Sequence, residues 1–244
     1  MNLYLSPHHD DVCFSIGHLA SRQGGALINL FTTSRYVAAP MELPGAIDEQ
    51  VAVITGLRRA EDEAFTGAAG LTRHDLGFSE PPVLGRRPFD LEDQDQAVAE
   101  LSARLTPYLL ALLDGGGPDP AMLFCPMGIG GHRDHLATFL AIRGIAAQLS
   151  NRCALLLYED LHYASNPLAR RAGLQRAEQV FAGSAFTAMA VRMTAQEAAR
   201  KMELVGLYAS QHSAQPRLAQ FTPASELAPE PHEIVWRVSW PSAA

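Results

Sequence analysis

The sequence predicts an α/β fold, a three-layer α/β/α sandwich around a mostly parallel sheet. Short apolar runs alternate with longer amphipathic segments along the chain, which is typical of strands joined by covering helices. The 244 residues suffice for one large α/β domain, and 48% hydrophobic with 18% charged residues is the composition of a globular protein. We therefore expect residues 1–244 to form a single domain.

The first half of the chain predicts three strands and three helices. The apolar run at 2–5 is a short buried strand, and the helix at 11–23 is stopped by Gly24-Gly25. The other elements expected in this half are a strand at 26–32, a loop at 34–45, a helix at 48–69, a strand at 73–78, a loop at 79–88 and a helix at 91–114.

The second half continues the alternation. Thr194 with Glu197 forms a capping-box pattern, which predicts a helix from there to about residue 208. The other elements expected are a strand at 121–125, a glycine-rich loop at 127–131, a helix at 132–149, a strand at 153–158, a helix at 167–181, a strand at 186–193, a loop at 207–221 and a strand at 233–240.

Charge and cysteine content exclude several classes of protein. A net charge of -7 without a basic stripe argues against a binder of nucleic acid or of anionic membranes. No apolar run has membrane-spanning length, no signal peptide is visible, and the three cysteines form no Cys-x-x-Cys pair. We expect a cytoplasmic protein that does not insert into membranes. Abundant Ala and Gly, with Lys201 as the only lysine, suggest a bacterial source.

Two clusters of ionisable residues follow predicted strands. Ser6-Pro7-His8-His9-Asp10-Asp11 comes directly after the first strand, and Gly131-His132-Arg133-Asp134-His135 follows the strand at 121–125 after a short loop. Polar groups are costly to concentrate beside a core unless they have partners or a function. Ligands of parallel α/β folds bind at the carboxyl ends of the strands. The two clusters therefore predict one shared site.

The residue types in the clusters suit a catalytic metal. Zinc in enzymes takes three nitrogen or oxygen ligands and keeps one position open. His8 and Asp11 are three residues apart, as are His132 and His135, so two histidines and one carboxylate can be drawn from the clusters. Asp10 and one histidine then remain for proton transfer, which metal-assisted hydrolysis requires. This pattern favours a metal-dependent hydrolase.

These residues also carry a family resemblance. The first cluster resembles the N-terminal His-x-Asp-Asp motif of PIG-L-type de-N-acetylases, also called LmbE-like proteins, and His132 to His135 resembles their His-x-Asp-His motif. Arg58-Arg59-Ala60-Glu61-Asp62 is similar to the family's Arg/Glu helix. Lys201 through Ser210-Gln211 resembles its late segment. The motifs occur in the family's order.

The resemblance implies a Rossmann-like fold and zinc-dependent removal of an N-acyl group, usually N-acetyl, from an amino sugar or a glycosylated small molecule. It implies that the metal ligands are His8, Asp11 and His135. Asp10 would be the general base that activates the attacking water. A protonated His132, held by Asp134, would then stabilise the oxyanion.

The resemblance also implies a substrate contact from Arg58 or Arg59, of which we prefer Arg58. The chain departs from the family pattern at Val12, at Gly17-His18 and at Tyr208, which stands where the family has a late histidine. None of these departures removes an implied ligand or the base. They bear on which N-acylated substrate is bound and not on whether it is hydrolysed. The His18 imidazole is expected to lie near the site.

Two other functions remain open at this point. Two histidines and one carboxylate also suit Fe²⁺ in redox enzymes, although a second carboxylate such as Asp10 suits hydrolysis better. A catalytically inactive sugar-binding homologue is the other alternative, against which the retained Asp10 and His132 argue.

His9 is interpreted as a surface or pocket-wall residue. The loops at 34–45, 79–88 and 207–221 are expected to wall the pocket, and a homo-oligomer is left open.

Overall fold

The computed structural model describes residues 1–117, 120–228 and 230–239. Its centre is one seven-stranded sheet in which β1 to β5 run parallel and β7 runs antiparallel to both of its neighbours. In spatial order the strands are β3 (Leu71–Ser79), β2 (Gly25–Thr33), β1 (Asn2–Ser6), β4 (Ala121–Pro126), β5 (Cys153–Tyr158), β7 (His232–Ser239) and β6 (Ala185–Arg192). The predicted mostly parallel α/β fold is confirmed.

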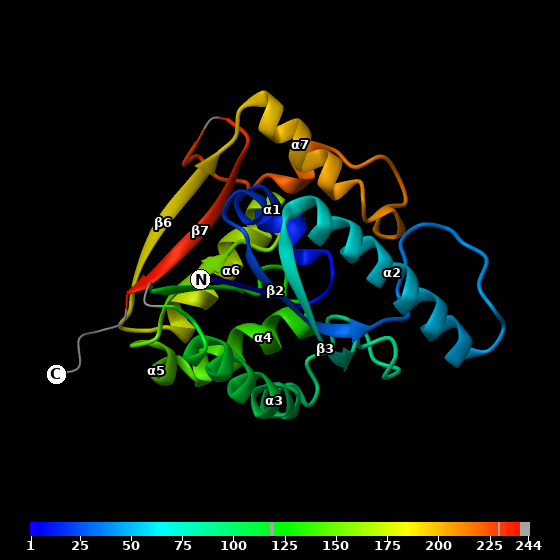
Figure 1. Cartoon of the computed structure of the whole chain (residues 1–244), viewed down its shortest axis with the longest axis horizontal. Coiled ribbons are helices and arrows are strands. Elements are labelled where there is room, and N and C mark those ends of the chain that lie inside the picture. The colour runs from blue at the N-terminus through cyan, green and yellow to red at the C-terminus, as the bar shows by residue number, and fades with distance from the viewer. Residues whose placement is uncertain (118–119, 229, 240–244) are drawn as a thin grey trace.

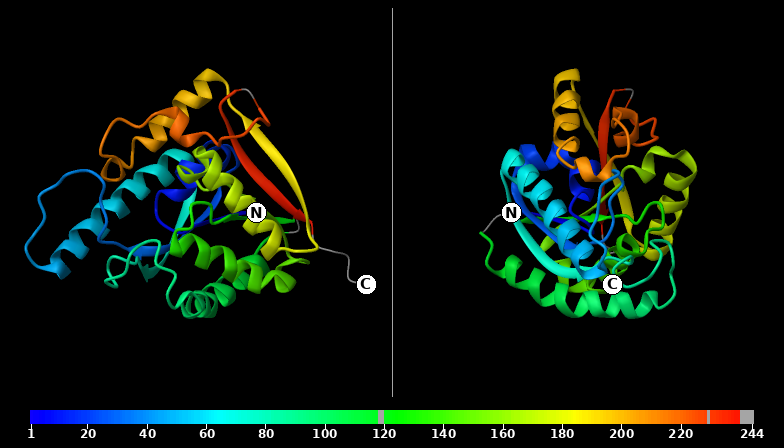
Figure 2. Two further views of the ribbon diagram at one scale, coloured as in Figure 1. Left: turned by 180° about the vertical axis from the view of Figure 1, so that it is seen from behind. Right: turned by 90° about the vertical axis from the view of Figure 1, so that its right-hand side faces the viewer.

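Helices cover both faces of the sheet (Figures 1 and 2). Side chains alternate across each strand, so that Leu3 and Leu5 point to one core and Tyr4 to the other. The first core takes helices α3 (Gln94–Asp114), α4 (Arg133–Gly144), α5 (Ala146–Leu149) and α6 (Pro167–Val180). The second core takes α1 (Asp11–Gln23), α2 (Ile47–Ala69) and α7 (Ala195–Val205). The three-layer arrangement follows from these two cores.

Most predicted elements are present with small shifts at their ends. Gly70 ends α2 in the left-handed conformation with φ 67°, and the capping box of Thr194 and Glu197 opens α7. The predicted helix at 132–149 is broken at Ile145 into α4 and α5. The helix expected from residue 91 begins only at Gln94, and α7 ends at Val205. Trp240, the predicted end of the last strand, lies outside the described residues.

Strand order places the two polar clusters side by side. The chain runs from β1 outward through β2 to β3, and it returns to the other side of β1 with β4. β1 and β4 pair in parallel, with Tyr4 opposite Phe124. Their carboxyl ends therefore open at the point where the strand order reverses, and this is where α/β folds bind ligands.

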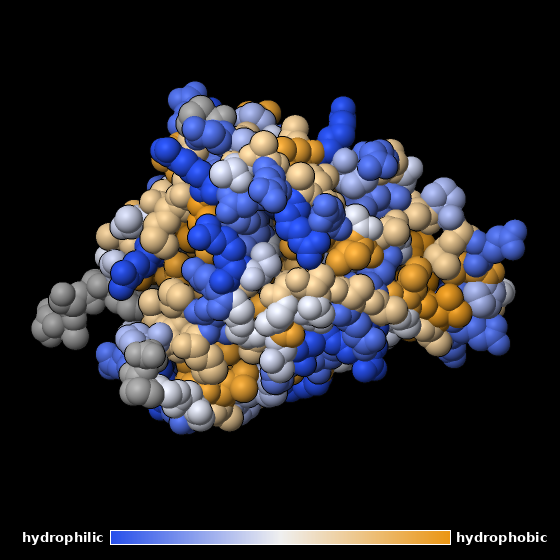
Figure 3. Space-filling model, turned by 45° about the horizontal axis from the view of Figure 1, so that its top comes forward, coloured by the Kyte–Doolittle hydropathy of each residue, from blue (hydrophilic) through white to orange (hydrophobic). Residues whose placement is uncertain are grey.

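The surface is mixed in polarity (Figure 3). Met41, Leu43, Ile47 and Val53 expose apolar side chains on the loop before α2 and on the first turns of that helix. This end of the molecule lies at the right in Figures 1 and 3. Among the helices in the described part of the chain, none combines the length and the apolar character needed to cross a membrane.

Candidate active site

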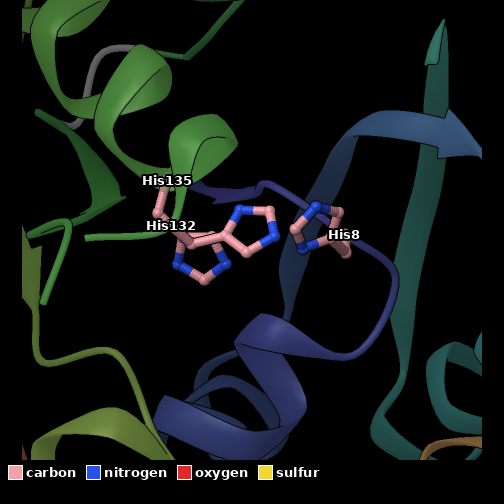
Figure 4. A group of neighbouring side chains, drawn as sticks. All are labelled: His8, His132 and His135. Atoms are coloured by element: carbon pink, nitrogen blue, oxygen red, sulfur yellow. The ribbon is translucent and has the colours of Figure 1, made fainter. Parts of the chain in front are cut away.

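The loop after β1 and the start of α4 bring the candidate histidines together. His8 comes from the loop, while His132 and His135 come from the first turn of α4, and the three rings face the same space (Figure 4). The rings of His8 and His132 lie 4.8 Å apart, and those of His132 and His135 lie 5.1 Å apart. Together with Asp10 and Asp11 they line a cavity of about 610 Å³.

Asp11 lies between His8 and His135, the other two residues that were expected to bind a metal. Its Oδ2 lies 3.1 Å from Nδ1 of His8, and its Oδ1 lies 3.3 Å from Nε2 of His135. Asp11, the first residue of α1, also accepts a hydrogen bond of 2.7 Å from the backbone N–H of His8. Although burial opposes ionisation, the neighbouring His135 and His8 hold the pKa of the Asp11 carboxyl well below its usual range.

Asp160 orients His135 from the opposite side of the ring. Its Oδ1 lies 2.7 Å from Nδ1 of His135, which leaves Nε2 directed at Asp11. The second Asp160 oxygen accepts the backbone N–H groups of Met127 and Ile129 at 3.1 and 2.9 Å. Asp160 was not among the residues predicted for the site, although Glu159-Asp160 directly follows β5 and so repeats the signal of ionisable residues at a strand end.

These residues fit a divalent metal. Two overlapping groups of close donor atoms share His8: one with His132 and His135, the other with Asp10 and Asp11. A histidine whose second ring nitrogen binds a carboxylate, as in His135 with Asp160, is the usual arrangement beside protein-bound zinc. The donor set contains imidazole and carboxylate and no thiolate, which suits zinc and iron alike.

The structure corrects the expected partner of Asp134. Its carboxylate does not hold the His132 ring; it lies 2.9 Å from Nε2 of His8. His132 is the N-cap of α4, and its Nδ1 accepts the backbone N–H of Asp134 at 3.2 Å. Asp134 therefore steadies a candidate metal ligand, and only its backbone steadies His132.

The surroundings of His132 oppose the protonation expected for it. Burial lowers the pKa of His132 to about 2, with contributions from the nearby His8 and His135. Because Nδ1 accepts a hydrogen bond, the single ring proton lies on Nε2. A neutral His132 can still donate a hydrogen bond, and this residue lines the cavity.

Asp10 is held by Arg58, which the sequence predicted as a substrate contact. The guanidinium lies 3.1 Å from Oδ1 of Asp10 and also binds Glu80, at the end of β3, and Ser34. Arg58 lines the cavity and is only 2% exposed, whereas Arg59 points to solvent and pairs with Glu63. Glu80 lines the cavity too and was not singled out from the sequence.

His9 and His18 lie away from the cavity lining. His9 is neither a surface nor a pocket-wall residue, because it is 1% exposed and its Nε2 lies 3.9 Å from Asp75. His18 is buried with its Nε2 3.8 Å from Glu197. Tyr208 is buried as well, and its hydroxyl lies 2.8 Å from the carbonyl oxygen of His9.

All three of the expected loops contribute to the cavity wall. The cavity is lined from 34–45 by Tyr36 and Ala38, and from 79–88 by Glu80 and the prolines. The wall contributed by 207–221 is mostly polar. It consists of Gln211, His212, Ser213, Ala214, Gln215, Pro216, Arg217, Gln220 and Phe221.

The chain is similar in sequence to a deacetylase. Over 170 residues the chain is 31% identical to 2'-N-acetylparomamine deacetylase of Streptomyces fradiae, a match that covers 66% of this chain and 57% of the relative. No family model matches the chain.

Solved structures share the whole fold at lower identity. The A40926 pseudoaglycone deacetylase has a TM-score of 0.67 and 20% identity over 100% of this chain and 98% of its own. The zinc-inhibited form of a teicoplanin deacetylase has a TM-score of 0.64 and 20% identity, over 100% of this chain and 99% of its own.

Proposed function

We propose that the chain belongs to the LmbE-like, PIG-L-type family and that it is a metal-dependent deacylase. Its substrate class is an N-acylated amino sugar, carried by a glycosylated small molecule. The similarity to 2'-N-acetylparomamine deacetylase supports this class. The observation that carries the proposal is the convergence of His8, Asp11 and His135 in a cavity that also holds a second carboxylate, Asp10.

His8, Asp11 and His135 would hold the metal, and we propose zinc as that metal. Zinc bound there would lower the pKa of water and polarise the acyl carbonyl. Asp134 and Asp160 support this role by binding the ring nitrogens of His8 and His135 that face away from Asp11. Iron suits the same ligands, and metal reconstitution distinguishes the two.

Asp10 is proposed as the general base. One carboxylate oxygen is bound to Arg58, and the residue lines the cavity next to His8 and Asp11. It takes a proton from water as the water oxygen forms a bond to the acyl carbon. The same proton can then pass to the amide nitrogen as the carbon–nitrogen bond breaks. The products are a carboxylate and a free amine.

His132 is proposed to stabilise the oxyanion. Its Nδ1 is fixed by the backbone of Asp134, so that Nε2–H is free to donate to the carbonyl oxygen as negative charge develops there. The neutral ring suits this role, since a donor needs only the proton. Removing one such donor costs about 3 kcal/mol of transition-state stabilisation, so His132→Ala is expected to slow turnover about a hundredfold.

Arg58 and Glu80 are proposed to contact the sugar from the wall of the cavity. Their ion pair fixes both side chains beside Asp10, and Ser34 donates to Glu80 at 2.6 Å. Glu80 can accept hydrogen bonds from sugar hydroxyl groups. Arg58 keeps Asp10 in position while it does so.

Hydrolysis by metal-stripped and reconstituted enzyme tests the proposal. We expect release of acetate from N-acetylated glycosides with one equivalent of zinc, none after chelation, and recovery when zinc is returned. Because one similar deacetylase is known in a zinc-inhibited form, zinc is titrated from below one equivalent. Activity restored by iron alone with consumption of oxygen would contradict the proposal.

Asp10→Asn separates catalysis from metal binding. We expect kcat to fall by about a hundredfold to ten-thousandfold with the zinc content unchanged, since a general base contributes that much to rate. Arg59→Ala is the matched control on the solvent side of α2 and is expected to leave both values unchanged. An Asp10→Asn enzyme with full activity would exclude Asp10 as the base.

We further propose that residues 1–244 form one domain of a cytoplasmic bacterial enzyme. The relative from Streptomyces supports the bacterial source. Three buried cysteines without disulfides suit a reducing compartment.

A further inference from the structure

Beside His132 the cavity has an apolar wall. Pro88, Phe89, Leu161 and Tyr163 line this part of the cavity, and we call them the acyl wall. The ring of Phe89 lies 5.7 Å from that of His132, and the ring of Tyr163 lies 5.8 Å from that of His135. The acyl wall therefore begins at the residues proposed to act on the carbonyl group.

Phe89 is unusual in its exposure. It is 56% exposed although it touches the buried centre of the site, and its ring meets the Tyr163 ring edge to face at 6.3 Å. Water contact of a large aromatic side chain costs free energy, so an apolar group laid along this ring would be stabilised by burying it.

The loop that carries Phe89 is fixed rather than loose. The backbone N–H of Arg133 donates to the carbonyl oxygen of Pro88 at 2.8 Å. The guanidinium of Arg133 donates to the carbonyl oxygens of Asp90, Glu92 and Asp93, and Arg133 is 6% exposed. Arg133 directly follows His132 in the sequence. The segment that carries the proposed oxyanion donor therefore also anchors the loop that carries Phe89.

The Tyr163 side of the wall is fixed as well. A Cβ on Gly130, which has φ +90°, would lie 2.3 Å from the Tyr163 ring, so only glycine leaves room for this ring. The ring is thus packed in place.

Another part of the cavity wall differs in chemistry. Gln211, Ser213, Gln215 and Arg217 supply donors and acceptors there, in keeping with sugar hydroxyl groups. A substrate amide has two arms on its carbonyl carbon, the acyl chain and the amine of the sugar. The polar wall suits the sugar arm, and the apolar wall beside His132 suits the acyl arm.

We propose that the acyl wall is a binding subsite for acyl chains longer than acetyl, with Phe89 as the residue that determines chain length. This inference rests on the proposed deacylase function and extends it. In this proposal the chain runs outward from the carbonyl carbon along Phe89, whose ring lines the cavity and is 56% exposed to solvent. A long linear acyl group is accommodated without displacing the sugar.

A chain-length series tests the subsite. The zinc-loaded enzyme is given glucosamine N-acylated with acetyl, butanoyl or octanoyl groups, and kcat/KM is measured from the acid released. For Phe89→Ala we expect kcat/KM on the octanoyl amide to fall about tenfold or more, a range typical of lost apolar pocket contacts, with acetyl within about twofold. Leu84→Ala, equally exposed on the same loop but outside the lining, is the matched control and leaves the series unchanged.

Binding provides a readout that does not need turnover. In the zinc-loaded Asp10→Asn enzyme, calorimetry gives Kd for the acetyl and octanoyl amides with and without the Phe89→Ala change. We expect the preference for the octanoyl amide to be lost with Phe89.

Two results overturn the subsite. A Phe89→Ala enzyme that loses affinity for all chain lengths equally would show that Phe89 stacks on the sugar. A wild-type enzyme that binds acetyl but rejects octanoyl would show that the wall is closed to chains. Failure of the proposed function is distinct from both, because then no amide is hydrolysed while the binding preference remains measurable.

Discussion

Asp160 controls the orientation of His135 through a hydrogen bond of 2.7 Å to Nδ1. The carboxylate is fully buried and is itself fixed by two backbone N–H groups, so the ring has one orientation. A carboxylate in this position also makes the other ring nitrogen a stronger ligand. The metal affinity of the site is therefore expected to depend on a residue that does not touch the metal.

Asp160→Asn is expected to weaken zinc binding about tenfold to a hundredfold, the usual effect of losing such a partner. A competition titration with a chromophoric chelator measures the affinity. Asp114→Asn, an exposed carboxylate paired with Arg152, is the control and leaves the affinity unchanged. Equal affinity in Asp160→Asn and wild type would contradict this role of Asp160.

Asp62, on α2, is a second buried carboxylate and is not part of the cavity lining. Burial raises the pKa of Asp62 to about 7, and its Oδ2 accepts from Asn29 at 2.7 Å. The hydroxyl of Tyr208 lies 2.8 Å from both Asp62 and the carbonyl oxygen of His9, yet it has one proton. The Tyr208 hydroxyl can donate to Asp62 Oδ1 or to the His9 carbonyl oxygen, and a protonated Asp62 would allow both contacts to be hydrogen bonds.

This pKa predicts how stability changes with pH. The folded pKa lies above that of the unfolded chain, so between about pH 4 and pH 7 the folded state binds more protons. The free energy of unfolding attributable to Asp62 therefore falls as pH rises through this window. Urea unfolding of wild type and Asp62→Asn at several pH values measures it: the wild type should lose stability relative to the variant as pH rises. Parallel curves would contradict the raised pKa.

At the scale of elements, helix α1 contains a kink, and a buried ion pair binds the backbone groups on either side of it. Ile16 has φ −135° and ψ 29°, which interrupts the helical hydrogen bonds at this turn. Glu233 on β7 accepts the backbone N–H groups of His18 and Leu19, both at 2.9 Å. Lys201 on α7 donates to the carbonyl oxygen of Ser15 and pairs with Glu233 at 2.9 Å.

Lys201→Met is expected to lower the free energy of unfolding by about 3–5 kcal/mol, because it leaves Glu233 buried without its counter-charge. The double variant with Glu233→Gln is expected to recover part of that loss. Urea unfolding measures both. Arg200→Met is the control on the same helix, since Arg200 is exposed and its surface pair with Glu203 contributes little. A loss from Lys201→Met no larger than that of the control would contradict a structural role for the pair.

At the scale of the whole molecule, the proposed metal site joins the segments that follow neighbouring strands of the sheet. His8 and Asp11 follow β1, His135 follows β4, and Asp160 follows β5. Local openings of the segments after these strands would separate the ligands, so a metal bound to all of them favours the folded state. Binding to the folded state alone raises stability by mass action.

We therefore expect zinc to raise the melting temperature. Free zinc at about a hundred times Kd stabilises by about 2.7 kcal/mol. For a chain of this size that corresponds to a shift of about 5–10 °C. Scanning calorimetry of chelated and zinc-loaded enzyme measures the shift, and Asp11→Asn should show much less of it. An equal shift in that variant would place the zinc elsewhere.

Much of the fold followed from local patterns in the sequence. The apolar run of β1, the stop at Gly24-Gly25 and the capping box at Thr194 each depend on a few neighbouring residues, and the structure has all three. The break of the helix at Ile145 and the late start of α3 were not predicted, because tertiary packing sets helix ends as much as local propensity does.

By itself the sequence determined five of the residues that meet at the site. His8, Asp10, Asp11, His132 and His135 lie at strand ends or helix starts, and parallel strands bring such positions to one edge. Only the tertiary structure decided how they are partnered: Asp134 with His8, Asp160 with His135, and Glu80 with Arg58. The periodicity of apolar residues in the sequence indicates which face of a helix or strand a side chain lies on. These contacts, in contrast, join residues that are far apart in the chain. They depend on strand order and on the N-cap geometry of α4.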